Sequence, residues 1–162
     1  MALRTIRTEG DPVLNKVCKP VKEMTDRTRE LIEDMFDTMY DGNGVGLAAN
    51  QVGILKQIVV IDVEDGNQYV LINPEIISEE GTQTGQEGCL SVPEMSGTVT
   101  RPQKVTVRAF DENMQEFELT GEDLLARAIC HECDHLKGRL YTELVEGDLH
   151  NVNDPEYQED EE

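Results

Sequence analysis

The sequence has no tryptophan, and aromatic residues make up only 4% of its 162 residues. The core must therefore be built from Leu, Ile, Val, Met and Ala. No apolar stretch approaches the roughly 20 residues that a membrane span needs, and no apolar signal region follows the charges of the N-terminus. We therefore expect a cytoplasmic protein without membrane segments. The length suits one domain with its own core and is too short for two.

Basic residues are also scarce: 14 Lys and Arg stand against 34 Asp and Glu, which gives a formal net charge of -20. A surface this acidic repels phosphate backbones and anionic lipids, so we expect no direct binding to nucleic acid or to membranes. Residues 151–162 are polar and rich in Asp and Glu. We predict a single domain over residues 1–150, followed by a disordered acidic tail over residues 151–162.

Histidine occurs only three times, and two of the three fall in a His-Glu-x-x-His pattern. On a helix, His131 and His135 lie only ~40° apart around the axis, so both imidazoles can reach one ion. Glu132 lies ~60° from His135, where it can reach a water on that ion but is poorly placed to be a ligand. The alternative is a simple polar edge of an amphipathic helix. The rarity of histidine favours the metal site.

Four cysteines in a reducing compartment are thiols or metal ligands rather than disulfides. Cys130 and Cys133 resemble a redox Cys-x-x-Cys pair, but inside a predicted helix they lack the usual activation of the thiolate. They point largely away from the two imidazoles, so a third metal ligand should come from elsewhere. Cys89, which lies among small residues, is open to three interpretations: a buried hydrophobe, a nucleophile or a metal ligand.

The periodicity of apolar residues predicts an α+β fold, with antiparallel sheets and hairpins packed around a central helix that carries the two histidines. We expect, in chain order, a short helix started by Asp11 and Pro12, a helix over Thr25–Tyr40, a hairpin of Ile54–Val63 with Gln68–Asn73, a loop from Ser78 to Gly85, a hairpin of Lys104–Phe110 with Gln115–Leu119, and a helix capped by Thr120 and closed by Gly138. Leu124, Leu125, Ala128, Ile129 and Leu136 form the expected core side of that last helix.

Three stretches of the chain match, in order, the motifs of a known family. Residues 44–51 read Gly-Val-Gly-Leu-Ala-Ala-Asn-Gln, residues 87–91 read Glu-Gly-Cys-Leu-Ser, and residues 130–138 contain the histidine pattern. Together they resemble the motifs of peptide deformylases, and the resemblance covers nearly the whole chain before the acidic tail. One position departs, because the family usually has Gln where this chain has Cys130. By the helical geometry that residue lies off the metal-facing side, so we expect activity to survive.

The resemblance implies a metal-dependent hydrolase that removes the N-formyl group from the N-terminal methionine of nascent polypeptides and releases formate. It makes Cys89 the third metal ligand beside His131 and His135, and it leaves one position for water. Glu132 would carry the proton from the water to the leaving amine. Gln51, on its own more often a surface amide, would stabilise the oxyanion together with the backbone N–H of Leu90.

The resemblance also implies where the N-formylmethionyl peptide binds. By position, the methionine pocket includes Val45, Leu124, Arg127 and Ala128, with the charge of Arg127 reaching water. The peptide backbone would pair as an added strand with Val45-Gly46 and with Glu87-Gly88. The ligand types favour zinc, whereas the family typically uses ferrous iron; we expect Fe²⁺, with Zn²⁺ or Ni²⁺ as substitutes. A transient contact with the ribosome is also expected.

Two other functions fit parts of the sequence. A zinc endopeptidase would use the same helix, with a third ligand after it, either His150 or a glutamate of the acidic tail. A binding protein that keeps the fold without catalysis is the second alternative. Glu132 and Gln51 count against the latter, because a binder has no use for a proton shuttle together with an oxyanion donor.

Overall fold

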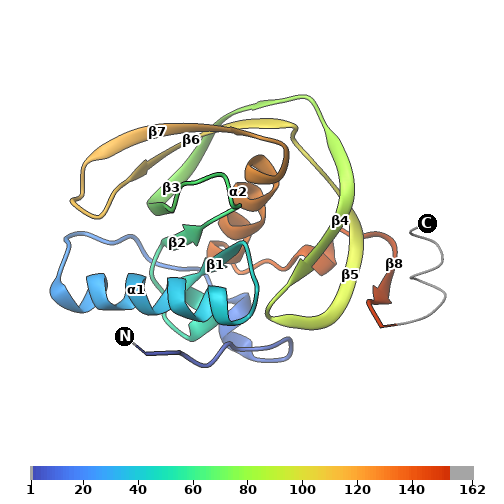
Figure 1. The fold of residues 1–162 in the computed structure, drawn as a ribbon, viewed down its shortest axis with the longest axis horizontal. Helices are drawn as coiled ribbons and strands as arrows, with labels where there is room; N and C mark the ends of the chain where they lie inside the picture. Colours follow the sequence, from blue (N-terminus) through green and yellow to red (C-terminus); the bar gives the residue numbers. More distant parts are fainter. Residues whose placement is uncertain (1, 154–162) are drawn as a thin grey trace.

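The computed structural model describes residues 2–153. Its elements are, in order, η1 (Pro12–Asn15), α1 (Asp26–Asp41), β1 (Gly46–Ala48), η2 (Ala49–Val52), β2 (Ile58–Ile61), β3 (Tyr69–Glu80), β4 (Gln83–Cys89), β5 (Val92–Arg101), β6 (Lys104–Phe110), β7 (Glu116–Glu122), α2 (Asp123–Leu136), η3 (Tyr141–Glu143) and β8 (Glu146–Asn151), where η is a 3₁₀ helix. The strands form two antiparallel sheets, ordered β1-β2-β3-β6-β7 and β4-β5-β8. Figure 1 shows α2 at the centre, between the two sheets. The α+β prediction with a central helix is confirmed.

The short strand β2 explains how the helices are held against the first sheet. All four of its residues are buried, and side chains alternate between the two faces of a strand. Val59 and Ile61 pack in the cluster that contains Ile129 and Leu136 of α2. Ile58 and Val60 pack in a second cluster, with residues of α1 such as Met35 and Met39. The sheet is therefore covered by α2 on one face and α1 on the other.

The first long helix and both predicted hairpins are confirmed. The Thr25 hydroxyl caps α1 by accepting a hydrogen bond from the Thr28 N–H at 3.1 Å. β2 pairs with β3, and β6 pairs with β7. The first strand of the first hairpin is shorter than predicted, because it begins at Ile58 rather than at Ile54.

The predicted loop from Ser78 to Gly85 is wrong. β3 continues past Pro74 to Glu80, and β4 begins at Gln83, so this segment carries the chain from the first sheet into the second. Proline usually ends a paired strand because it has no N–H to donate. Here the register of β3 against β6 shifts between Ile72 and Glu75, so Pro74 falls where the ladder is already interrupted.

The predicted start of the histidine helix is also wrong. Thr120 lies in β7, where its hydroxyl is 2.9 Å from that of Thr106 on the neighbouring strand. The helix begins only at Asp123, after Glu122, which makes no side-chain capping bond. Leu124 is not a core residue, since 46% of its surface is exposed. Gly138, with φ of +79°, closes the helix as predicted because this backbone conformation suits glycine.

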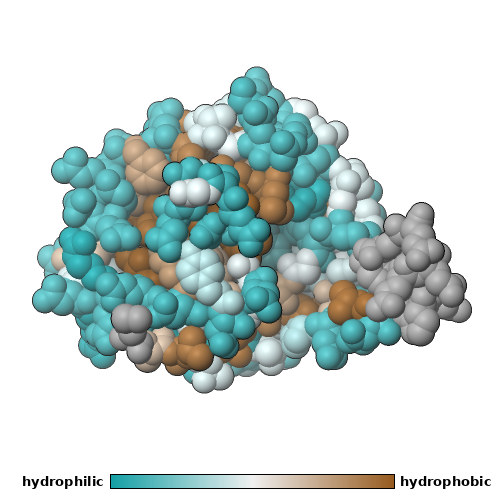
Figure 2. All heavy atoms as spheres, viewed as in Figure 1, coloured by the Kyte–Doolittle hydropathy of each residue, from teal (hydrophilic) through white to brown (hydrophobic). Residues whose placement is uncertain are grey.

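The last element of the described chain is the strand β8, which overlaps the predicted tail only at Asn151. β8 pairs with β5, and the pairing reaches Asn151, which lies opposite Met95. Asn151 therefore belongs to the folded domain, and residues 154–162 of the predicted tail lie outside the described residues. Within residues 2–153, neither α1 nor α2 is long and apolar enough to cross a bilayer. Hydrophilic side chains cover most of the face shown in Figure 2.

Candidate active site and metal centre

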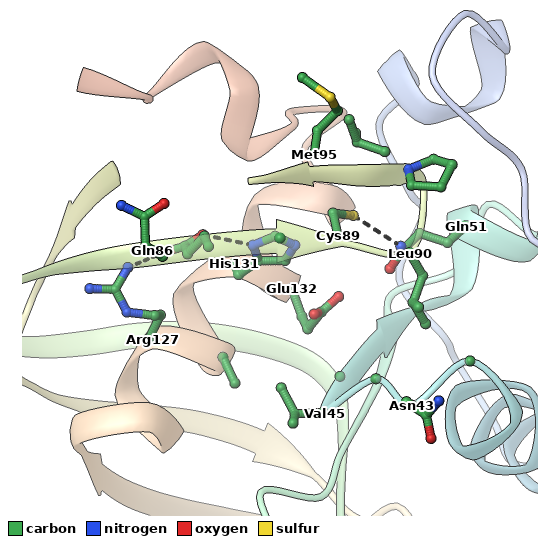
Figure 3. A pocket seen from close by; sticks show the side chains of 18 of the residues that line it. Asn43, Val45, Gln51, Gln86, Cys89, Leu90, Met95, Arg127, His131 and Glu132 are labelled. Carbon is green, nitrogen blue, oxygen red and sulfur yellow. Dashed lines mark hydrogen bonds and ion pairs between the residues drawn. The ribbon is translucent and has the colours of Figure 1, made fainter. Parts of the chain in front are cut away.

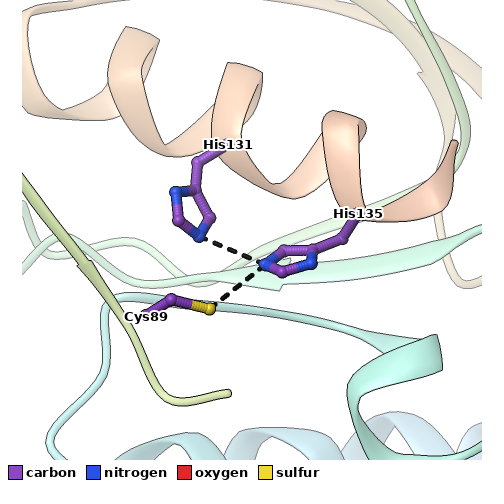
Figure 4. A group of neighbouring side chains, drawn as sticks. All are labelled: Cys89, His131 and His135. Carbon is purple, nitrogen blue, oxygen red and sulfur yellow. Dashed lines mark hydrogen bonds between the residues drawn. The ribbon is translucent and has the colours of Figure 1, made fainter. Parts of the chain in front are cut away.

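The end of β4 and two successive turns of α2 bring Cys89, His131 and His135 together (Figure 4). The Cys89 sulfur lies 3.3 Å from Nε2 of His135, and the two Nε2 atoms of His131 and His135 are 3.2 Å apart. Both histidines are buried and Cys89 is partly buried. No other metal-binding group of three or more side chains is found among residues 2–153.

These three side chains fit one metal ion. A thiolate and two imidazoles bound tetrahedrally to one ion lie roughly 3.4–3.6 Å from one another, close to the separations seen here. Nδ1 of His131 is 2.8 Å from Oε1 of Glu87, so its proton lies on that side and its Nε2 lone pair faces Cys89. Burial, together with the neighbouring His131, holds the pKa of His135 well below its usual value and keeps that imidazole neutral.

His131 binds a proton more readily than His135. Burial lowers the pKa of His131, but the charge of Glu132 and the hydrogen bonds with Cys89 and Glu87 outweigh that effect and hold it well above its usual value. A proton on Nε2 would occupy the lone pair that a metal needs. Protons and metal therefore compete at this nitrogen.

Glu87 organises the cluster behind His131. Its two oxygens accept hydrogen bonds from Nε and Nη2 of Arg101 at 2.8 and 3.0 Å, and from Nη1 of Arg127 at 2.7 Å. Burial raises the pKa of Glu87, but the hydrogen bonds with His131 and Arg101 outweigh it and lower the pKa to about 2. Arg101 also donates to Asp134 at 2.7 Å. The expected exposure of the Arg127 charge is therefore wrong: it is buried against Glu87.

We expect the Glu87→Gln variant to be less stable than the wild type at pH 7, by an amount that shrinks in acid. The folded-state pKa lies below the ordinary 4.5, so the carboxylate stabilises the protein above about pH 4.5 and loses that effect as the pH falls toward 2. The difference between the two pKa values corresponds to roughly 3 kcal/mol of folding free energy. Denaturant unfolding of metal-stripped protein across this range, with the exposed Glu118→Gln as control, measures it. A stability difference between wild type and Glu87→Gln that does not change with pH would contradict the lowered pKa.

Glu132 faces the cavity beside the metal group (Figure 3). Burial raises its pKa to about 7 against the opposing effect of His131. Its Oε1 has no hydrogen-bond partner among the described residues, although buried carboxylate oxygens are normally paired. Oε2 lies so near Gly46 that an added Cβ there would be 2.6 Å away, so only glycine at position 46 leaves room for this carboxylate.

Gln51 is held with its amide nitrogen toward the sulfur of Cys89. Its Nε2 donates to Ser91 Oγ at 3.0 Å and lies 3.5 Å from Cys89 Sγ, while its Oε1 accepts from the N–H of Ala48 at 2.9 Å. Only 1% of its surface is exposed, so the alternative of a surface amide is wrong. Leu90, between Cys89 and Ser91 in the turn from β4 to β5, lies at the same cavity.

A cavity of about 490 Å³ opens next to Glu132 and Cys89. All seven residues predicted to bind substrate line it: Val45, Gly46, Glu87, Gly88, Leu124, Arg127 and Ala128. β1 lies at one edge of the first sheet and β4 at one edge of the second. Both edges border the cavity, so an extended peptide placed there could pair with either strand.

Several residues of the site could not be recognised from sequence. Arg101 lies outside every element and motif that the sequence predicts, and Ser91 is only the last residue of the second motif. Asn50, whose side chain donates to the carbonyl of His135, reads as one more small polar residue. The only sequence signal for Asn50 and Ser91 is that they lie inside two of the three motifs. His150 lies in β8, opposite Ser96 and outside the metal group, so it is not the third ligand that an endopeptidase would need. The tail glutamates, the other candidates, lie outside the described residues.

The two cysteines of α2 lie apart from the metal group, as the helical geometry predicted. Cys130 and Cys133 belong to the core cluster that also contains Ile129. Burial raises the pKa of Cys130 to about 11 and that of Cys133 to about 12. Both are thus protonated thiols at neutral pH, and neither has the thiolate of a redox pair.

Comparison with known proteins agrees with this geometry. The family model described as Polypeptide deformylase matches residues 3–149. The chain belongs to the polypeptide deformylase family. It is 63% identical to a peptide deformylase of Agathobacter rectalis over 98% of this chain and all of that protein. The crystal structure of a peptide deformylase from Legionella pneumophila has a TM-score of 0.87 at 46% identity, covering 90% of this chain and 87% of that one. That of the Thermotoga maritima enzyme has a TM-score of 0.88 at 38% identity, covering 91% and 100%.

The resemblance read from the three motifs is therefore confirmed. Deformylases are metal-dependent enzymes that remove the N-formyl group from nascent peptides, and this chain is one of them. The group formed by Cys89, His131 and His135 gives the described chain a place for the metal that such an enzyme requires.

Proposed function

We propose that Cys89, His131 and His135 hold the catalytic metal of this deformylase and that Glu132, Gln51 and Leu90 carry out its chemistry. One observation supports this above all. The only three-ligand group among residues 2–153 lies beside a buried carboxylate, Glu132, whose Oε1 has no partner there. When bound, the metal supplies a polarised carbonyl and a water of lowered pKa.

The proton steps are assigned to Glu132. As a carboxylate it accepts a proton from water at Oε1 or Oε2, and as an acid it returns the proton to the nitrogen of the departing amine. Burial raises the pKa of Glu132 to about 7 in the metal-free site, and a bound cation would lower it, so the carboxylate is available to accept a proton near neutral pH. Glu132 lines the cavity, so both the attacking water and the nitrogen of the departing amine can reach its carboxylate.

Two hydrogen-bond donors are assigned to stabilise the negative charge that develops on the formyl oxygen. The Gln51 amide nitrogen is fixed toward the metal group by Ser91 and by the backbone of Ala48, so no reorientation is needed during the reaction. The backbone N–H of Leu90, one residue after Cys89, is the second. Single donors of this kind are worth roughly 3 kcal/mol.

Substrate binding is assigned to the cavity and its two edge strands. The methionine side chain would enter beside Val45, Leu124 and Ala128, with the stem of Arg127 behind them. The peptide backbone would pair with Val45-Gly46 of the first sheet and Glu87-Gly88 of the second. The side chain of Glu87 takes no part in this, because it is committed to two arginines and His131.

We further propose that the native metal is Fe²⁺, with Zn²⁺ or Ni²⁺ as substitutes. The enzyme acts in the cytoplasm on nascent chains and makes transient contact with the ribosome. Protein purified without oxygen should contain about one iron per chain and release formate from formyl-methionyl peptides but not cleave internal amides. Exposure to air should abolish the activity, and adding Fe²⁺ or Ni²⁺ without oxygen should restore it. Anaerobic protein that holds only zinc at full activity would contradict the assignment of iron.

A further inference from the structure

The ring of Tyr141 stacks on the imidazole of His131, one of the three proposed metal ligands. The two ring centroids lie 5.8 Å apart, and the ring planes are inclined by 28°. Aromatic pairs favour offset arrangements with centroids about 4.5–7 Å apart, so this contact is favourable. Tyr141 lies in η3, shortly after the end of α2, and only 1% of its surface is exposed. The phenol ring is therefore packed in place against one face of the imidazole.

Tyr141 also contacts the hairpin of β4 and β5, which carries Cys89. Its hydroxyl donates a hydrogen bond to the carbonyl of Met95 in β5 at 3.2 Å, and Met95 lines the active-site cavity. Its ring belongs to a third apolar cluster, with Val92 and Val99, and Cys89 packs against that cluster. One buried side chain thus connects the histidine helix with the hairpin that supplies the thiolate.

The hydrogen bond from Glu87 leaves one freedom of the His131 ring unrestrained. The bond joins Nδ1 to Oε1 of Glu87 at 2.8 Å and fixes the direction in which Nδ1 points. A single hydrogen bond tolerates some tilt of the ring plane, because its energy falls steeply only at large angles. The lone pair of Nε2 lies in that plane, so a tilt would turn it away from Cys89 and His135. A stacked ring resists the tilt, because tilting closes the contact on one side and opens a gap on the other.

We propose that Tyr141 is a positioning residue, which holds the plane of the His131 ring and so keeps Nε2 directed at the metal. The inference rests on the proposed function, in which His131 is a ligand. Two neighbours then restrain the imidazole in different ways: the Glu87 carboxylate acts on Nδ1 in the ring plane, and the Tyr141 ring acts on the face. Outer partners that orient a metal ligand are typically worth about 10–100-fold in metal affinity or activity.

Substitutions at position 141 separate the ring from the hydroxyl. Tyr141→Phe keeps the stacked ring and removes only the hydrogen bond to Met95. Tyr141→Leu removes the ring, and Tyr141→Met is a second ring-free variant with a longer, flexible side chain, for the case that the leucine variant does not fold. Phe36→Leu is the matched control, because it removes a buried aromatic ring from the cluster on the α1 side of the first sheet, away from the metal group.

The experiment measures how fast each Ni²⁺-loaded protein releases its metal to an excess of chelator. We expect the ring-free variants to release it at least about tenfold faster than the wild type. Tyr141→Phe should release it at the rate of the wild type, and so should Phe36→Leu, although the latter unfolds at a lower denaturant concentration. With Co²⁺ in place of Ni²⁺, the absorption spectrum reports the geometry of the ligands, and only the ring-free variants should change it.

Three results would overturn the inference. The first is release at the wild-type rate, with an unchanged Co²⁺ spectrum, from a folded ring-free variant. The second is equally accelerated release from Phe36→Leu, because lost stability alone would then explain the effect. The third is equally accelerated release from Tyr141→Phe, which would assign the effect to the hydroxyl. His131→Ala tests the proposed function separately: if this variant also released the metal no faster than the wild type, His131 would not be a ligand.

Discussion

The Glu132→Gln variant should release formate at least about a thousandfold more slowly than the wild type while still binding one metal ion per chain. Glutamine has nearly the shape of glutamate and can fill the space left beside Gly46. It cannot accept a proton from water or return it to the amine, and general acid–base groups contribute about 10²–10⁴-fold. Glu132 is not in the metal group, so metal content should stay the same. Single-turnover formate release and elemental analysis check both expectations.

The pH profile provides a second readout for Glu132. In the wild type, kcat/KM should rise with pH as the carboxylate loses its proton. Because a bound cation favours the charged form, this rise should lie below the value of about 7 found for the metal-free site. In Glu132→Gln that rise should disappear, while in the exposed control Glu118→Gln it should persist. Turnover above one-tenth of the wild type in Glu132→Gln would remove the proton-shuttle role.

The sequence was informative where local geometry decides the structure. His135 follows His131 by four positions, and any α-helix places such residues on one side, so this half of the metal group was predictable from spacing. The hairpins were predictable for the same reason, since alternation over Lys104–Phe110 needs no tertiary information. The position of Cys89 was different. Its own neighbourhood allowed three interpretations, and only the resemblance to a family selected the metal ligand.

Long-range contacts explain what the sequence could not reveal. Arg127 reads as an arginine at a pocket edge, and an exposed charge is the ordinary expectation for it. It is buried because an oxygen of Glu87, forty positions earlier, accepts a hydrogen bond from it at 2.7 Å, and because Arg101 also donates to the Glu87 carboxylate. Pro74 reads as a strand end, yet a register shift against β6 lets the strand continue. Neither the contact of Arg127 with Glu87 nor the pairing of β3 with β6 can be inferred from the local sequence pattern.

The second large effect is expected for the third ligand. The Cys89→Ser variant should lose its metal to a chelator at a concentration that the wild type withstands, and its activity should fall at least about a hundredfold. A thiol loses its proton readily when it binds a metal, whereas a hydroxyl does so only at far higher pH, so the variant has two good ligands instead of three. Metal content after dialysis against the chelator, followed by formate release, tests this.

Cys130→Ser is the matched control, because it makes the same chemical change on the helix that carries both histidines. Its sulfur lies in the core cluster of α2 rather than in the metal group, so this variant should keep its metal and most of its activity. The contrast depends on position alone: the register of β4 against β5 shifts between Gly88 and Cys89, where the strand ends beside the imidazoles. If both variants kept their metal equally well, Cys89 would not be a ligand. The third ligand beside His131 and His135 would then have to be another residue.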